Sequence, residues 1–255
     1  MRANDRVLVV IPARFGSSRF PGKALADLGG APLVVRTAQT AARITAADNI
    51  VVATDDERIL EAVTAAGLDC EMTGDCATGT DRVGEVARRH EHGIVVNLQG
   101  DEPLLAPREI DRLIGAMRTD PGTDVATFGH PFGDESAWRD PNQVKVVTGT
   151  DGSALYFSRA AIPGTFPGAA AGGHDSGHRA ALRHIGIYGF RRPALERFLG
   201  LERTPLEIAE GLEQLRALEN GMTIRVLATD HEPIGVDTPE DLEAVRALWR
   251  DRDGT

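Results

Sequence analysis

Continuous apolar runs in the first half of the chain predict strands of a sheet that is buried on both faces. Such strands contain unbroken hydrophobic segments rather than alternating ones. The runs cover residues 7–11, 50–53 and 94–96. Segments with helical spacing of apolar residues cover 32–43, 57–66, 81–89 and 107–117. This alternation, with short connections, predicts an α/β fold with a Rossmann-like, doubly wound, mostly parallel sheet.

Three loops follow the carboxyl ends of these predicted strands, where doubly wound sheets bind their ligands. They cover residues 12–23, 54–56 and 99–103. We therefore expect the chemistry of the protein to depend on side chains from these loops.

The middle of the chain has a different pattern. Short strands are predicted at 144–148, 154–157 and 185–190, and a Gly-, Ala- and Pro-rich segment without periodicity covers 163–177. The end returns to an α/β pattern, with a helix at 205–219, a strand at 223–228 and a helix at 239–249. We expect one domain over 1–255, with a smaller inserted β-rich subdomain at about 142–192 covering the cleft.

Composition excludes several classes of protein. The chain has 255 residues and a formal net charge of −10, which argues against binding to nucleic acid or to a membrane surface. The N-terminal apolar run is too short for a signal peptide, so a cytoplasmic protein is expected. The two cysteines form no disulfide framework and lack the usual zinc spacing.

Lysine is rare in this chain. Of 28 lysine and arginine residues only Lys23 and Lys145 are lysines. These two positions are candidates for roles that need a compact ammonium group rather than a planar guanidinium, and chance retention is the alternative.

The loop after the first predicted strand combines glycines and serines with three cations, Arg14, Arg19 and Lys23. Its backbone N–H groups can approach an anion closely. It is not a Walker A loop, because its glycines are one residue too far apart and Ala24 stands where Ser or Thr is required. No Gly-x-Gly-x-x-Gly dinucleotide fingerprint occurs at a suitable place. The loop predicts a phosphate site, with a plain surface turn as the alternative.

Two aspartates are candidate ligands of Mg²⁺, which favours one or two carboxylates plus phosphate oxygens. Asp101 follows a buried strand, although it could be a turn residue before Pro103. Asp237 precedes a predicted helix that Thr238 caps and Asp241 helps to close, so its carboxylate is left for another partner. Alone it could be structural, but together the two aspartates predict a metal site.

Eight motifs then occur in order along the chain: Ile11–Lys23, Gly79–Arg82, Asn97–Pro103, Asn142–Val147, Leu155–Arg159, Arg183–Phe190, Leu212–Arg216 and Gly235–Leu242. In this order they resemble the bacterial CMP-KDO synthetases, the 3-deoxy-manno-octulosonate cytidylyltransferases. The sialic acid cytidylyltransferases are similar in the first loop, but the segments 99–103 and 184–188 favour the KDO branch.

The resemblance implies a nucleotidyltransferase-type fold and the transfer of CMP from CTP to an acidic sugar, KDO, with release of pyrophosphate. It implies that Arg14, Arg19 and Lys23 hold the triphosphate, with Lys23 near the α-phosphate. It implies Mg²⁺ as the cofactor, held by Asp101 and Asp237, one ion activating the nucleophile and another neutralising the triphosphate. The expected partners are CTP, a small acid and a second copy of the chain.

The resemblance also assigns binding residues. Those around the cytosine and ribose would be Ala13, Gly79, Thr80, Arg82 and Gln99. Those on the acceptor side would be Arg159, His184, Tyr188, Glu213 and Gln214.

Periodicity gives a further expectation for the helix predicted at 205–219. Its core stripe would be Ile208, Leu212 and Leu215, and its opposite face would carry Glu210, Glu213 and Gln214. Plain solvation of that polar face is the alternative.

Histidines add one candidate site. His184 together with Arg159 predicts an anion pocket, with a structural histidine as the alternative. His174 and His178 are spaced for one helix face, but their Gly- and Ala-rich surroundings argue against a zinc site.

The chain departs from the resembled family in the Gly- and Ala-rich stretch after Pro163, and at Asp81, where glutamate is usual. The first departure leaves open the same transfer to a different acid, such as the phosphonate phosphonoformate or another keto-deoxy sugar acid. Two other classes are less favoured. A Rossmann oxidoreductase would need the missing glycine fingerprint, and a non-catalytic nucleotide-binding module would not need the metal carboxylates.

Overall fold

Strand β1 (Val7–Ala13) forms the centre of a four-stranded parallel arrangement in the first of two compact units. A computed structural model of the chain describes residues 5–16, 19–164, 177–232 and 234–253. The first unit comprises Met1–Arg118 with Pro233–Thr255, and the second comprises Thr119–Glu232. Residues 165–176 of the predicted 163–177 loop, and His174 with them, lie outside the described residues.

The sheet of the first unit confirms the predicted parallel strands. Its order is β6 (Ile94–Asn97), β1, β4 (Asn49–Thr54), β5 (Cys70–Met72), and each neighbouring pair is parallel. The side chains of residues 7–11 are completely buried, as expected for a central strand covered on both faces. The short strand β5 was not predicted, because its three residues include a glutamate and form no apolar run.

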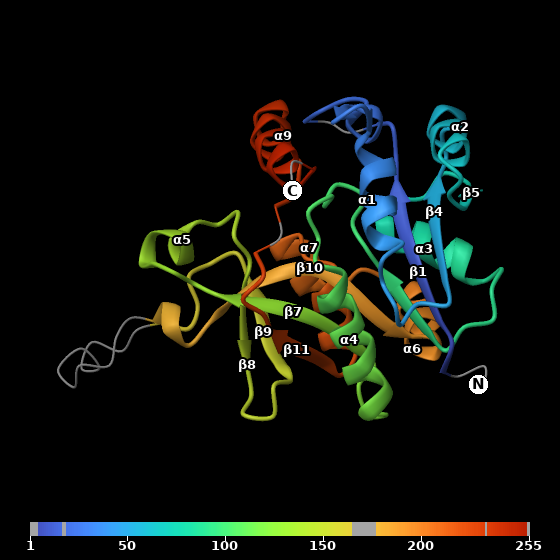
Figure 1. Cartoon of the computed structure of the whole chain (residues 1–255). Coiled ribbons are helices and arrows are strands. Elements are labelled where there is room, and N and C mark those ends of the chain that lie inside the picture. Colours follow the sequence, from blue (N-terminus) through green and yellow to red (C-terminus); the bar gives the residue numbers. More distant parts are fainter. Residues whose placement is uncertain (1–4, 17–18, 165–176, 233, 254–255) are drawn as a thin grey trace. The chain divides into compact units, whose positions relative to one another are not determined.

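Helices cover both faces of this sheet. They are α1 (Leu33–Ala41), α2 (Glu57–Ala65), α3 (Gly79–Ala87) and α4 (Pro107–Thr119). Helix α9 (Pro239–Asp253) belongs to the same unit but packs in a separate apolar cluster. Helices α1 and α2 connect strands that succeed one another in one direction, whereas α3 returns in the other, so right-handed crossovers put α3 on the opposite face (Figure 1). A short 3₁₀ helix, η2 (Lys23–Leu25), and the hairpin β2 (Asp27–Leu28) with β3 (Ala31–Pro32) precede α1.

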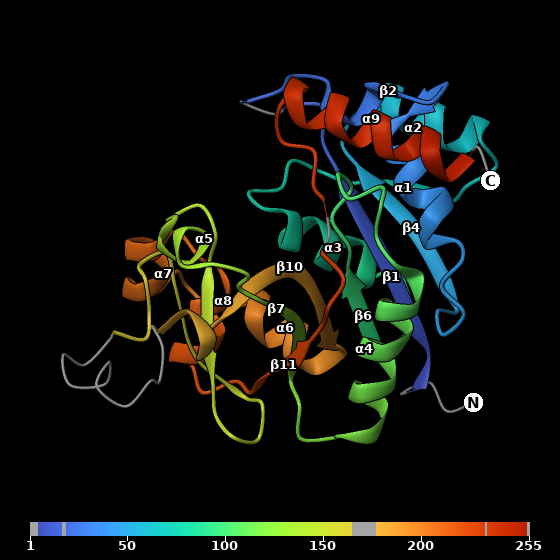
Figure 2. The same ribbon diagram turned by 60° about the vertical axis from the view of Figure 1, so that its left-hand side comes forward.

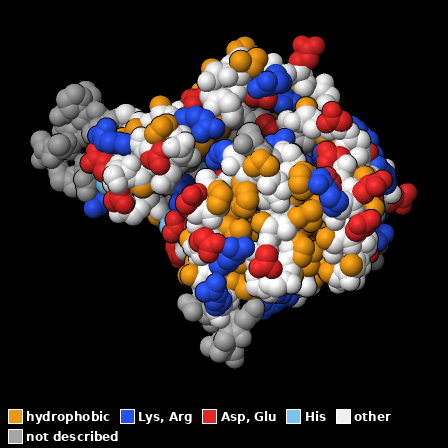
Figure 3. Space-filling view, turned by 90° about the horizontal axis from the view of Figure 1, so that it is seen from above, with side chains coloured by type: hydrophobic (Ala, Val, Ile, Leu, Met, Phe, Trp, Pro, Cys, Tyr) orange, Lys and Arg blue, Asp and Glu red, His pale blue; other side chains and the backbone are white. Residues whose placement is uncertain are grey.

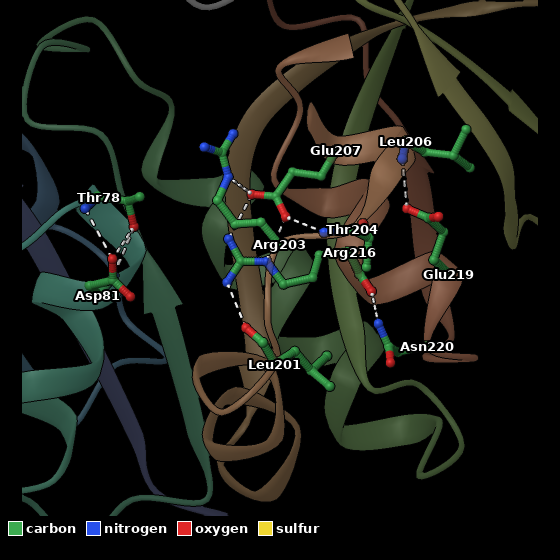
Figure 4. Close-up of polar contacts among 10 residues, drawn as sticks. All are labelled: Thr78, Asp81, Leu201, Arg203, Thr204, Leu206, Glu207, Arg216, Glu219 and Asn220. Atoms are coloured by element: carbon green, nitrogen blue, oxygen red, sulfur yellow. Dashed lines mark hydrogen bonds and ion pairs between the residues drawn. The ribbon is translucent and has the colours of Figure 1, made fainter. Parts of the chain in front are cut away.

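Side-chain caps fix where two of these helices begin. Asp56 accepts a hydrogen bond from the backbone N–H of Arg58 at the start of α2. At the start of α3, Thr78 and Asp81 bond each other's backbone N–H groups in a capping box (Figure 4). Aspartate at residue 81 therefore performs the capping role that glutamate would have at this position.

An apolar cluster holds helix α9 against the rest of the first unit. Its buried members are Leu28, Leu33, Leu104, Val236, Leu242 and Val245, and Phe20, Ala26 and Trp249 pack against them. The cluster unites residues from the start of the chain with residues from its end. Figure 2 shows α9 running past α1 and the β2–β3 hairpin.

The second unit is mostly antiparallel. Strand β10 (Leu182–Arg191) pairs antiparallel with β7 (Val125–Pro131) and β8 (Lys145–Thr148), and β8 pairs antiparallel with β9 (Ala154–Ser158). Strand β11 (Ile224–Ala228) lies parallel to β7. The helices are α5 (Glu135–Arg139), η4 (Gly177–Arg179), α6 (Arg192–Leu199), α7 (Pro205–Glu210) and α8 (Gln214–Glu219). The predicted subdomain, residues 142–192, lies within this unit.

The single helix predicted for 205–219 is wrong. Gly211 adopts a left-handed conformation with φ of 63° and ends α7, and α8 begins at Gln214 as a separate helix. The helical phase is therefore lost: Ile208 is 61% exposed, whereas Gln214, expected on a polar face, is 6% exposed. Leu212 and Leu215 are buried as expected.

A buried ion pair connects the two short helices. Glu207 is 2% exposed and accepts two hydrogen bonds from Arg216, at 2.8 and 2.7 Å. Exposed Arg203 reaches the same carboxylate at 3.2 Å, and the guanidinium of Arg216 lies 4.6 Å from the ring centroid of Phe198. Figure 4 shows the carboxylate between the two arginines. Such a pair is stable only while both partners remain.

Charged side chains of both signs are mixed on the described surface. On the face drawn in Figure 3, acidic side chains lie among the basic ones. None of the helices in the described part of the chain combines the length and apolar character needed to span a membrane.

Candidate functional site

Three charged loops of the first unit meet at Lys23. Its ammonium nitrogen lies 2.6 Å from an oxygen of Asp101 and 3.3 Å from an oxygen of Asp237. Arg19 reaches the same oxygen of Asp237 at 3.0 Å. The Lys23 side chain is 14% exposed, whereas those of Asp237 and Arg19 are 49% and 67% exposed. The structure thus brings together two predicted carboxylates and two predicted cations at a place that solvent reaches.

Backbone bonds place Asp101 and Asp237 side by side although they lie 136 positions apart in the sequence. The N–H of Val236 donates to the carbonyl of Asp101 at 2.9 Å, which fixes the last segment against the loop after β6. The Asp241 carboxylate accepts from the N–H groups of Asp237 and Thr238, at 2.9 and 2.8 Å, and the Thr238 hydroxyl caps α9. The predicted cap is confirmed, and the carboxylate of Asp237 is left for the cations.

Close packing fixes the loop that carries Asp101. A Cβ atom on Gly100 would lie 2.9 Å from the carbonyl oxygen of Pro12, so only glycine lets this loop approach the end of β1. Two buried hydroxyls of α1 anchor it from the other side: Thr37 donates to the carbonyl of Gly100 and Thr40 to that of Pro103, both at 3.1 Å. Sequence reasoning missed these threonines, since they occupy apolar positions of the helix.

The carboxylate pair fits a hard divalent cation. Asp101 and Asp237 already share one positive group, the ammonium of Lys23. Among the described residues no group of three or more His, Cys, Asp or Glu side chains is placed to hold a metal ion. A metal between these two carboxylates would therefore take its other ligands from phosphate oxygens and water, the set that Mg²⁺ prefers.

Glu102 gives the same loop a second carboxyl group. It is 9% exposed, and its Oε2 atom has no hydrogen-bond partner among the described residues. Burial and the charge of Asp101 raise the pKa of Glu102 to about 8.

Most of the other nucleotide-binding candidates lie in the same unit, near the ends of β1 and β6. Ala13 ends β1, and Gly79 begins α3, where its Cβ position lies 3.6 Å from the ring of Pro12. Thr80 is buried and accepts from Asn97 at 3.4 Å. Gln99 lies two residues after the end of β6. Arg14 is exposed, and no hydrogen bond or ion pair joins it to another described residue.

Arg82 is placed differently from what a freely available ligand would require. It is 3% exposed, and its guanidinium bonds the hydroxyl of Thr73 and the carboxylate of Asp55. Asp55 comes directly after β4, and Asp101 lies in the loop after β6, so both follow the carboxyl end of a parallel strand. Sequence reasoning marked the loop 54–56 for its position but missed this pairing, which gives Arg82 a fixed orientation.

The acceptor-side candidates all lie in the second unit. His184 and Tyr188 are on β10, with ring centroids 5.4 Å apart. His184 Nε2 lies 3.2 Å from the hydroxyl of Thr127, and the rings of His184 and Phe157 make a T-shaped contact with their centroids 5.0 Å apart. Burial lowers the pKa of His184 to about 3, so its ring is neutral near pH 7. Burial and the charge of Glu213 raise the pKa of Tyr188. His184, Tyr188 and Glu213 therefore lie near one another in the second unit.

Arg159 and Gln214 complete this set. Arg159 follows β9 and is bonded to the backbone carbonyls of Glu210 and Pro141, at 2.8 and 3.2 Å. In the described chain, no hydrogen bond, ion pair or ring contact joins it to His184, so the predicted pairing of these two is not a direct one. The Nε2 atom of Gln214 is buried without a hydrogen-bond partner among the described residues.

Comparison with known proteins gives three findings. A family model described as cytidylyltransferase matches residues 8–224. A 3-deoxy-manno-octulosonate cytidylyltransferase of Anaeromyxobacter dehalogenans is 50% identical over 244 residues, which are 95% of this chain and 97% of that protein. The protein of the same name from Geobacter sulfurreducens is 47% identical over 243 residues, 94% of this chain and 97% of its own.

Solved structures agree. A CMP:2-keto-3-deoxy-manno-octonic acid synthetase complexed with CTP has a TM-score of 0.90 and 41% identity, covering 97% of this chain and 99% of that one. A 4-diphosphocytidyl-2C-methyl-D-erythritol synthase from Anaerococcus prevotii has a TM-score of 0.64 at 14% identity, with 97% of each chain covered. This second likeness concerns the fold alone.

Proposed function

The chain belongs to the cytidylyltransferase family, and we propose that it transfers CMP from CTP to KDO with release of pyrophosphate. A hydroxyl oxygen of the acid attacks the α-phosphorus of CTP. The bond from that phosphorus to the oxygen bridging to the β-phosphate breaks, and the hydroxyl proton passes to solvent. The observation that carries the proposal is the cluster of Lys23, Arg19, Asp101 and Asp237 at the carboxyl end of the parallel strands.

The cations of this cluster would bind the triphosphate. Lys23 lies at the start of η2 and Arg19 in the loop before it, and Arg14 adds a third charge that pairs with no described residue. Lys23 would place its ammonium at the α-phosphate, where negative charge grows as the hydroxyl attacks. Ala13, Gly79, Thr80, Arg82 and Gln99 would surround the cytosine and ribose.

The carboxylates of Asp101 and Asp237 would hold Mg²⁺. When bound, the ion would neutralise triphosphate charge and make the acceptor hydroxyl easier to deprotonate. Asp101 must release Lys23 for this, and Asp237 must release both Lys23 and Arg19. The phosphates offer those cations new partners. On the acceptor side, Arg159, His184, Tyr188, Glu213 and Gln214 would bind the acid.

The relatives' names support KDO as the acceptor, and their identities near 50% extend over almost the whole chain. We further propose a homodimer in the cytoplasm, with residues 142–192 as an inserted subdomain of a single nucleotidyltransferase domain. Sedimentation of the purified protein tests the dimer: a single species of twice the 27.3 kDa chain mass is expected, and a monomer would contradict it.

The test of the function is pyrophosphate release from CTP and Mg²⁺ across a panel of acids. The panel holds KDO, its 8-amino analogue, sialic acids and small phosphonates. Turnover with KDO is expected. Turnover with another acid alone would keep the reaction and change the acceptor, and no turnover despite CTP binding would overturn the proposal.

Variants tie the activity to the site. Asp101→Asn and Asp237→Asn should each weaken the metal-dependent turnover, because each removes a charged ligand. Glu240→Gln, an exposed change in the first turn of α9, is the matched control and should leave turnover unchanged. Unchanged metal dependence in both aspartate variants would exclude the proposed metal site.

A further inference from the structure

Lys145 is completely buried and its ammonium is fully bonded. The nitrogen donates to the carbonyl oxygens of Asp140, Gln143 and Arg159, at 2.9, 2.7 and 2.5 Å. An ammonium has three donors, so three carbonyls satisfy it. Burial lowers the pKa of Lys145, while the charges of Asp140 and Glu210 oppose that shift. A planar guanidinium would not fit three converging acceptors, which explains why this position is a lysine in a chain otherwise rich in arginine.

Glu210 holds the same segment from the side of α7. Its carboxylate accepts from the hydroxyl of Ser158 at 2.6 Å and from the backbone N–H of Arg159 at 2.9 Å. Its own carbonyl accepts from Nε of Arg159 at 2.8 Å. Lys145 also pairs with Ser158 in the β8–β9 ladder. Lys145 and Glu210 therefore both bond the chain where β9 ends, at Ser158 and Arg159.

Arg159 is therefore fixed at three places. Its N–H bonds Glu210, its C=O bonds Lys145, and its guanidinium bonds two carbonyls through Nε and Nη1. The Nη2 atom forms no hydrogen bond or ion pair with any described residue. One edge of an immobilised guanidinium is thus left for an anion, and guanidinium groups bind carboxylates and phosphonates well.

We propose that Lys145 and Glu210 are positioning residues that set the orientation of Arg159 for the acidic group of the acceptor. This inference rests on the proposed function, in which Arg159 binds the acid. Neither residue needs to touch substrate. A guanidinium that is already oriented loses less conformational freedom when the acid binds, so the two residues should act on acceptor affinity through Arg159.

A double-mutant cycle tests the proposal. Wild type, Glu210→Gln, Arg159→Ala and the double variant are assayed with KDO, or with the best acid of the panel. Arg159→Ala should raise the KM for the acid about 100-fold, and Glu210→Gln about 10-fold, with KM for CTP unchanged. The double variant should match Arg159→Ala within about twofold, because Glu210 acts only through Arg159. Glu202→Gln, an exposed change in the same unit, is the control.

The outcomes distinguish a failure of the proposed acceptor site from a failure of the positioning role. If Arg159→Ala leaves the KM for the acid unchanged, the acceptor site of the proposed function is wrong. If Arg159→Ala acts but Glu210→Gln does not, or if their effects multiply in the double variant, the positioning role is wrong. Should Glu210→Gln fail to fold, Ser158→Ala removes one donor to Glu210 and replaces it in the cycle.

A second measurement does not depend on turnover. In protein labelled with ¹⁵N-arginine, the Nε–H signal of Arg159, assigned by its loss in Arg159→Ala, should exchange slowly with water. Lys145→Arg and Glu210→Gln should each speed that exchange at least about 10-fold, and Glu202→Gln should not. Equal exchange in all four proteins would overturn the proposal.

Discussion

The two units hold their candidate side chains in different ways. In the first, Lys23, Arg19, Asp101 and Asp237 pair with one another on loops that solvent reaches. In the second, Arg159 is bonded on all sides but one, and His184 lies among Thr127, Phe157 and Tyr188. Mutual ion pairs can be exchanged for a ligand's charges, whereas bonds to backbone carbonyls, which carry no net charge, cannot. The exchangeable ion pairs of the first unit suit a charged ligand that binds together with a metal ion. The fixed side chains of the second unit suit a ligand that is recognised by its shape.

The strongest test of this contrast is the buried pair of the second unit. Arg216→Met leaves Glu207 buried without its main partner, so the free energy of unfolding should fall by about 3–5 kcal/mol, measured by urea denaturation. Arg203→Met removes an exposed partner of the same carboxylate and should cost about 1 kcal/mol or less. Equal losses would mean that burial of the pair does not determine its stability.

In the first unit the ammonium of Lys23 should matter for chemistry rather than for stability. Lys23→Arg keeps the charge but not its compact form, so turnover should fall about 100- to 1,000-fold while CTP binding, measured by calorimetry, stays within a few-fold. Arg43→Lys, an exposed change after α1, is the control. Full activity of the Lys23 variant would remove the special role of the ammonium.

Because the ion pairs of Lys23 can be exchanged, Lys23 should compete with a metal ion for the carboxylates of Asp101 and Asp237 when no nucleotide is bound. Lys23→Met should raise the affinity of the protein alone for Mn²⁺ about fivefold, since a partly exposed ion pair contributes on the order of 1 kcal/mol. Paramagnetic resonance of free Mn²⁺ measures this without turnover. Asp237→Asn should lower the affinity instead. If Lys23→Met also lowers it, the lysine does not occupy the metal's place.

Acid should lower the free energy of unfolding of the second unit by protonating Glu207. Burial alone would raise the pKa of Glu207, but the bonds from Arg216, Arg203 and the Thr204 amide outweigh it and hold the pKa below its ordinary 4.5. A carboxyl whose pKa is depressed on folding contributes stability above its unfolded pKa and loses it as pH falls through the folded value. Unfolding followed from pH 7 downwards should show this loss below about pH 4.5, and Glu207→Gln should flatten it.

The smallest effect is expected at His184. With a pKa of about 3, its ring should stay neutral between about pH 5 and 8, unlike an exposed histidine. The ring ¹⁵N chemical shifts of His184 should not change across this pH range. Any ionisation near pH 6.5 in the KM for the acid should persist in His184→Asn, because His184 does not cause it. A titrating ring would mean that His184 is more accessible to water than its contacts with Thr127, Phe157 and Tyr188 indicate.

The same contrast explains what sequence could predict. Residues 7–11 and 94–96 are unbroken apolar runs, so the parallel core and the loops after its strands followed directly, and with them Lys23 and Asp101. Asp237 followed from a different signal, the helix cap formed by Thr238 and Asp241. The helix predicted at 205–219 failed because apolar periodicity carries no sign of the left-handed turn at Gly211. The partners of Arg82 and Arg159 were missed because Asp55 and Glu210 meet them only through tertiary packing.

The bond from Val236 to the carbonyl of Asp101 has a consequence for synthesis on the ribosome. The first unit is interrupted by the second, and its last segment returns only after residue 232. All the strands are complete before Asp237 leaves the exit tunnel. A nascent chain can therefore form its sheets and still lack half of the carboxylate pair, so CTP meets a complete site only after the segment that carries Asp237 has left the tunnel and packed against the loop of Asp101.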